Sequence, residues 1–99
     1  MDPYEWEYLE EEDLCRVYLI GDGECIKIGI SYNPSYRLKI MQTGNSRELV
    51  LFATFPGGEK EEEYLHSYFK SKHKRGEWYF LDDQDILRIF GYFSGVELK

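Results

Sequence analysis

The residues with the clearest potential for chemistry lie in an alternating stretch at positions 16–30. Two runs of alternating residues are joined there by the Asp-Gly pair at 22–23, which favours the tight turn of a β-hairpin. With this pair as the whole loop, Tyr18 lies directly opposite Lys27 on one face of the hairpin. Gly29 shares that face and leaves room for another group to approach. We therefore expect a site on this face, while the opposite face packs into a core through Val17, Leu19, Ile26, Ile28 and Ile30.

A second set of candidates lies at positions 59–72, where the spacing of apolar residues predicts a helix. Its inward stripe consists of Glu62, Leu65, His66 and Phe69. Burial of an unpartnered carboxylate costs several kcal/mol, so Glu62 is expected to meet an arginine, a lysine or a divalent cation with hard oxygen ligands. The alternative is that Glu62 turns outward at the helix start, where the helix dipole favours acids. With only Glu62 beside it, His66 does not support a zinc site.

Basic residues at two further places could contact phosphate. A short helix is predicted to begin at the N-cap Asn33 and to end at Gly44, with Arg37 at the border of its sheet-facing stripe. Arg37 is either a surface residue or a forked phosphate ligand near Lys27. The basic run at 70–75 is either a helix C-terminus, where the dipole favours cations, or a contact to a nucleic-acid backbone.

The remaining elements complete an α+β pattern. Apolar residues on both alternations predict a central or covered strand at 48–55. Gly76 is expected to end the helix that precedes a short aromatic strand or extended segment at 77–81. A last helix is predicted at 84–90, capped by Asp82 or Asp83.

The charge of the chain is unevenly distributed. The 99 residues carry a net charge of −7, and seven of the 19 acids lie in the first 13 residues, which contain no base. We therefore divide the chain into an acidic, aromatic arm at 1–13 and one neutral domain at 14–99. The arm either packs on the domain, or covers its binding groove or docks on a basic partner protein.

The composition also limits location. No run of eighteen apolar residues and no apolar leader are found, which predicts neither a membrane span nor a signal peptide. Two cysteines alone cannot form a structural zinc site and do not indicate a secreted disulfide scaffold. We expect a cytoplasmic protein.

Taken together, these motifs resemble the GIY-YIG nuclease superfamily, in a form common among phage and bacterial proteins. The resemblance spans residues 16–81 and nearly the whole domain. It follows a series of short segments in order: Val17-Tyr18-Leu19, Ile26-Lys27-Ile28-Gly29, Asn33-Pro34, Arg37-Leu38, Gln42-Thr43-Gly44-Asn45, Glu62-x-x-Leu65-His66 and Gly76-Glu77-Trp78.

The resemblance implies a small three-stranded antiparallel sheet flanked by helices, and metal-dependent cleavage of DNA. Tyr18 would activate or orient the attacking water, and Lys27 stands in place of the usual second tyrosine. Arg37 would bind the scissile phosphate, Glu62 would hold a single Mg²⁺ or Mn²⁺, and His66 would be an accessory polar group. Gly29, Lys72 and Arg75 complete the expected substrate contacts.

The sequence departs from the family pattern in ways that leave two functions open. Arg16 replaces the first-motif glycine, the C-terminal asparagine of many active members is not identified, and a DNA-binding extension is not found. The first function is a small endonuclease, weak or delivered by a partner, that acts on DNA more readily than RNA. The second is a non-catalytic regulator on a nuclease fold that binds a protein or small ligand through the arm and the cleft.

Overall fold

A five-stranded antiparallel sheet forms the centre of the structure, a computed structural model that describes residues 15–98. The proposed arm at 1–13 lies outside the described residues. The sheet order is β3-β1-β2-β5-β4. The strands are β1 (Arg16–Gly21), β2 (Ile26–Ser31), β3 (Val50–Pro56), β4 (His73–Arg75) and β5 (Trp78–Tyr79).

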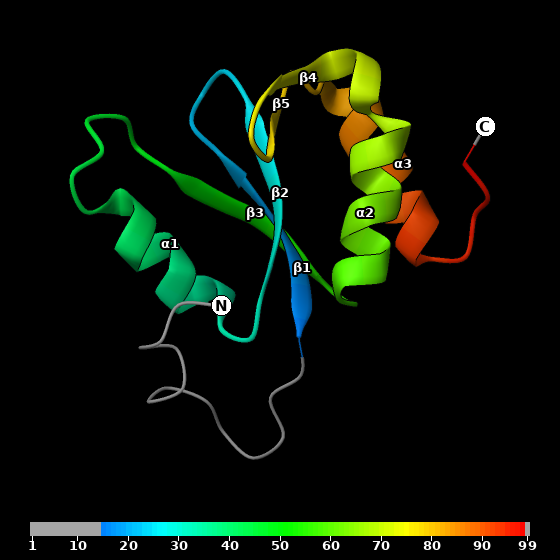
Figure 1. Cartoon of the computed structure of the whole chain (residues 1–99), viewed down its shortest axis with the longest axis horizontal. Coiled ribbons are helices and arrows are strands. Elements are labelled where there is room, and N and C mark those ends of the chain that lie inside the picture. The colour runs from blue at the N-terminus through cyan, green and yellow to red at the C-terminus, as the bar shows by residue number, and fades with distance from the viewer. Residues whose placement is uncertain (1–14, 99) are drawn as a thin grey trace.

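Helices cover both faces of this sheet, as Figure 1 shows. Helix α1 (Pro34–Gln42) lies on one side, and helices α2 (Glu59–Tyr68) and α3 (Asp83–Phe93) lie on the other. A short 3₁₀ helix, η2 (Lys70–Lys72), connects α2 to β4.

The alternation of β1 and β2 divides the interior into two clusters. The larger cluster lies between the sheet and α2 and α3, and contains Val17, Leu19, Ile26, Ile28, Phe55, Leu65, Phe69, Tyr79 and Ile89. The smaller cluster, under α1, contains Tyr18, Ile20 and Leu49, with Leu38, Met41, Leu51 and Trp78 packed against it. The hairpin is therefore buried on both faces.

The α+β class is confirmed, but the prediction of three strands is wrong. The basic run predicted as a helix C-terminus instead forms η2 and β4. Gly76, at φ +56°, makes the turn from β4 to β5 rather than ending a helix. The short strand or extended segment expected at 77–81 contains β5, whereas the three-residue β4 is too short to show alternation and was not predicted.

The hairpin loop has four residues, not two, which corrects the predicted register. Gly21 pairs with Ile26, and the Asp22 carboxylate accepts hydrogen bonds from the backbone N–H groups of Glu24 (2.9 Å) and Cys25 (2.7 Å). This local turn, stabilised by the side chain, competes with the expected two-residue turn. The register shifts by two residues, so each side chain keeps its predicted face while its partner changes.

The predicted helices and strand are found, with shifted ends. Asn33 caps α1 as expected, because its side chain accepts a hydrogen bond from Tyr36 N (3.1 Å). Helix α2 ends at Tyr68 and not at 72, and α3 extends to Phe93 and not only to 90. Strand β3 spans 50–56 instead of 48–55, and it lies at the edge of the sheet rather than at its centre, with only Phe55 buried. A membrane-spanning helix is not found in the described range 15–98.

Asp85 ties α3 to the end of η2. Its carboxylate is almost fully buried and accepts hydrogen bonds from Lys72 Nζ, from Arg88 (3.0 Å) and from Asp82 N (3.0 Å). Burial raises the pKa of Asp85, but the hydrogen bonds from Lys72 and Asp82 and the Lys72 charge outweigh it, so the pKa lies below its ordinary value.

Replacement of this buried acceptor is expected to weaken the fold. Asp85→Asn should lower the free energy of unfolding at pH 7 by about 2 kcal/mol, because Lys72 and Arg88 lose the buried carboxylate charge that they share. The depressed pKa means that the wild-type advantage is present above the ordinary pKa and is lost as pH falls through the folded-state pKa. Urea unfolding at pH 7 and pH 2.5 tests this, and an equal difference at both pH values would contradict it.

Candidate metal centre

Three residues bring two carboxylates and an imidazole to one place. Glu62 and His66 lie one turn apart on α2, and Glu77 lies just before β5. One donor atom from each of the three lies within 4.8 Å of the other two, and all three side chains are half-buried. Among the described residues, this is the group of acidic, histidine or cysteine side chains that could hold a metal ion.

The backbone of Ile28 positions this group at the outer edge of β2. Its N–H donates to the carbonyl oxygen of Glu77 (3.0 Å), and its carbonyl oxygen lies 2.8 Å from Nε2 of His66. In an antiparallel strand, the backbone N–H and C=O of one residue point to the same side of the strand. Strand β5 pairs with β2 only at Ile26 and Lys27, so the carbonyl of Ile28 is left for the imidazole.

This contact also orients the imidazole. A backbone carbonyl can only accept a hydrogen bond, so Nε2 of His66 is the donor in this contact and Nδ1 is the ring nitrogen left for another partner. The ring stacks on Tyr79, with centroids 5.3 Å apart. A histidine held by a backbone carbonyl through one nitrogen has the arrangement typical of metal ligands.

The two carboxylates repel each other without a cation. Burial raises the pKa of Glu62 to about 7, and the neighbouring Glu77 charge and the hydrogen bond between the two carboxyl groups add to this effect. Burial and the same two acids also raise the pKa of Tyr79. Two carboxylates and an imidazole are suitable ligands for Mn²⁺ and, with more oxygen ligands from water, for Mg²⁺. The residues therefore fit a single divalent cation.

The sequence located two of these three residues. The inward orientation of Glu62 and His66 is as predicted, but the partner of Glu62 is an acid, not an arginine or lysine. The sequence places Glu77 only within the Gly76-Glu77-Trp78 motif and predicts no metal-binding role for it. The available signal was a lone acid between a turn glycine and three aromatic residues.

Tyr18 and Gly29 form a second part of the predicted site. Tyr18 faces Gly29 across the hairpin and not Lys27, which faces Ile20. A Cβ on Gly29 would lie 2.5 Å from both Cζ and the hydroxyl oxygen of Tyr18. The Tyr18 ring thus fills the space above Gly29, and Tyr18 is only 2% exposed.

The predicted cations are divided among different surfaces. Arg37 lies half-buried on α1, on the sheet face opposite to α2. Lys72 pairs with Asp85 and Asp82 beside α3. Lys27 and Arg75 instead lie next to Trp78, their common cross-strand neighbour.

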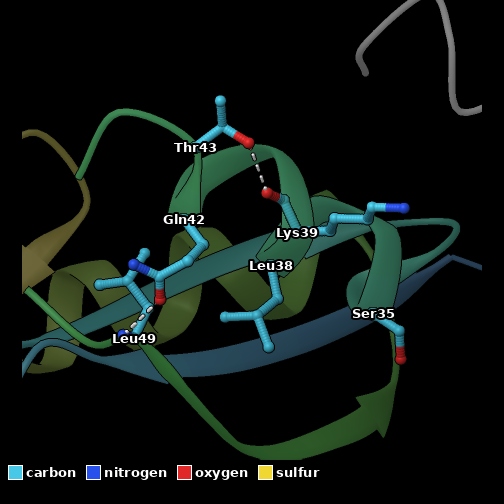
Figure 2. Close-up of a pocket in the computed structure, with 6 residues that line it drawn as sticks. All are labelled: Ser35, Leu38, Lys39, Gln42, Thr43 and Leu49. Carbon is cyan, nitrogen blue, oxygen red and sulfur yellow. Dashed lines mark hydrogen bonds between the residues drawn. The ribbon is translucent and has the colours of Figure 1, made fainter. Parts of the chain in front are cut away.

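A hollow of about 440 Å³ lies along α1, away from the acidic group. Figure 2 shows its lining residues, Ser35, Leu38, Lys39, Gln42, Thr43 and Leu49. The Gln42 side chain accepts from Leu49 N (2.8 Å) and donates to Arg47 O (2.8 Å), while Thr43 Oγ1 donates to Lys39 O (3.2 Å). These polar groups hold the loop that follows α1, so we interpret the hollow as structural.

Comparisons with protein-family models, with curated proteins and with solved structures found no match to this chain.

The repulsion between the two carboxylates predicts a stability that depends on pH. Glu62 has a raised pKa, so its contribution is most favourable below its ordinary pKa and is lost as pH rises through about 7. In EDTA, Glu62→Gln should be close to wild type at pH 5 and more stable by about 1–2 kcal/mol at pH 8. Urea unfolding measures this difference. Glu48→Gln, which removes an exposed acid outside α2, is the control, and a gain for Glu62→Gln that is equal at both pH values would refute the repulsion.

The close approach of Tyr18 to Gly29 predicts strong coupling between them. Gly29→Ala should destabilise the protein by about 1–3 kcal/mol, because the added methyl group displaces the Tyr18 ring. In a Tyr18→Leu background the same change should cost at least about 1 kcal/mol less. A double-mutant cycle by urea unfolding measures the coupling, and equal costs in both backgrounds would exclude this contact.

Proposed function

We propose that the protein is a small metal-dependent endonuclease of the GIY-YIG type that hydrolyses DNA phosphodiester bonds. The observation that carries the proposal is the convergence of Glu62, His66 and Glu77 on one point at the edge of β2. These residues would hold a single Mn²⁺ or Mg²⁺. The resemblance of the motifs from residue 16 to residue 81 supports the same reaction class.

The cation, when bound, would supply Lewis-acid stabilisation of charge on the phosphate. The chain supplies the arrangement around it. Glu62 and Glu77 provide the negative charge that selects a cation, and the hydrogen bond to the Ile28 carbonyl fixes the orientation of His66.

Tyr18 approaches this position from the other face of the sheet. Its hydroxyl oxygen lies over Gly29, which follows Ile28 directly in β2. The tyrosine is therefore placed one residue along the strand from the backbone group that holds His66. The motif resemblance gives Tyr18 the role of orienting the attacking water, which would require its buried hydroxyl to become accessible at this edge.

The burial of Tyr18 favours a second candidate function. A tyrosine that is 2% exposed gives little access to a water molecule or a phosphate. The second candidate is the non-catalytic regulator. It would bind a protein or ligand through the surface around Glu62, His66 and Glu77 and through the residues at 1–13.

A cleavage assay separates the two functions. Wild type, Glu62→Gln and Glu77→Gln would be incubated with Mn²⁺, with Mg²⁺ or with EDTA, and with single-stranded, duplex and branched DNA. We expect cleavage by wild type in Mn²⁺ or Mg²⁺ and a loss of at least about 100-fold in either variant, because each loses a ligand charge. Urea unfolding in EDTA at pH 8, applied to both variants, checks that each of them folds.

Glu63→Gln is the matched control, since it removes an exposed charge from the same helix and should retain wild-type cleavage. Cleavage that is undiminished in Glu62→Gln, or that persists in EDTA, would overturn the proposed metal centre. Failure of wild type to cleave any of these substrates would favour the regulator.

A further inference from the structure

A row of three side chains crosses the outer strands of the sheet. Lys27 of β2 is the direct cross-strand partner of Trp78 in β5, and Trp78 is the partner of Arg75 in β4. Directly paired residues of a regular ladder share a face of the sheet, and across the register shift in β4 Arg75 and Trp78 still line one common hollow. An indole therefore lies between two cations on the α1 side, and we name these three residues the Trp78 row.

The row lies on the sheet face that also bears α1. Toward the centre of the sheet, Lys27 pairs with Ile20 of β1, and Ile20 pairs with Leu51 of β3. Ile20 belongs to the cluster under α1, and Leu51 packs against that cluster. Trp78 packs against that cluster and is half-buried, whereas Arg75 is exposed. The indole is thus held by the core at one side and remains partly accessible at the other.

The charges of the row are not neutralised within the described part of the chain. Nearby Lys74 lies 3.4 Å from Glu24, and Arg47 lies 3.4 Å from Glu24 and 3.7 Å from Asp22. The ion pairs of residues 15–98 do not include Lys27 or Arg75. These two cations remain available for an anionic ligand.

A polar hollow lies against the row. It has a volume of about 210 Å³ and is lined by Asp22, Asn45, Lys74, Arg75 and Trp78. The hollow has room for a single flat heterocycle. It offers an aromatic ring for stacking, a carboxylate and an amide for hydrogen bonds, and two cations at its wall.

We propose that the Trp78 row binds single-stranded DNA, with an unpaired base stacked on Trp78 in the hollow and backbone phosphates on Lys27 and Arg75. An aromatic platform between cations is the arrangement that binds single strands, whose base faces are accessible, whereas the bases of a duplex are already stacked. This inference rests on the proposed nuclease function and names its substrate class. Glu77 directly precedes Trp78, so the row and the metal centre are adjacent along the chain.

The test measures binding in EDTA, where the proposed cleavage does not occur. A fluorescein-labelled 12-nucleotide DNA of mixed sequence is titrated with the full chain, as a single strand and as a duplex, and anisotropy is recorded. We expect at least tenfold tighter binding of the single strand. Trp78→Leu should weaken this binding about tenfold or more, and Trp78→Phe should retain most of it, because stacking needs an aromatic face.

Two further measurements identify the contacts. In a Trp6→Phe background Trp78 is the single tryptophan, and its fluorescence should be quenched by the single strand. Arg75→Gln should reduce the dependence of log affinity on log salt by about 0.7, since one phosphate contact is lost. Lys60→Gln, an exposed cation on α2, is the matched control and should leave the slope unchanged.

Equal affinity for duplex and single strand, unchanged affinity in folded Trp78→Leu, or lack of quenching would overturn the inference. These results are separable from the test of the nuclease. Cleavage of duplex DNA without the expected binding would refute the row and leave the nuclease intact. Binding without cleavage in Mn²⁺ would retain the row and refute the nuclease.

Discussion

The backbone of Ile28 is the constraint on which the rest of the site depends. Its N–H binds the segment before β5 through Glu77, and its carbonyl binds α2 through His66. Two parts of the chain that are separate in sequence therefore meet at one residue of the outer edge of β2. Because β5 is only two residues long, this edge is open to a side chain from α2.

This constraint also explains the electrostatics of the site. Glu62 lies on the same face of α2 as His66. The contact of His66 with the Ile28 carbonyl therefore also brings the Glu62 carboxylate close to that of Glu77. The fold thus holds two acids together at a cost in free energy, which a cation would remove. Such a conflict between stability and local charge is typical of a functional site.

The sheet separates two kinds of chemistry. Acids and an imidazole meet beside α2, while Lys27, Trp78 and Arg75 lie on the α1 face. The change of face occurs between Glu77 and Trp78, because successive residues of a strand point in opposite directions. In the proposed function, a bound DNA strand would pass around the short end of β5 to reach the candidate metal centre.

Much of the fold could be predicted from local patterns. Alternation assigned the two faces of the hairpin, and Asn33 marked the start of α1. The register could not be predicted, because the Asp22 side chain stabilises a longer loop that the Asp-Gly pair does not reveal.

Helical spacing likewise placed Glu62 and His66 on one face, since that is a property of a single element. Glu77 was missed because its role depends on a contact between β5 and β2, and such short strands leave no periodic signal. The pairing of Trp78 with Lys27 and Arg75 was hidden for the same reason.

The most direct measurement of the central claim is the anomalous scattering of Mn²⁺ in crystals of the wild-type protein. We predict one strong peak at about 2.0–2.3 Å from a carboxylate oxygen of Glu62, a carboxylate oxygen of Glu77 and a ring nitrogen of His66. A peak only at other residues, or the lack of a peak at saturating Mn²⁺, would contradict the account of these three residues as a metal centre.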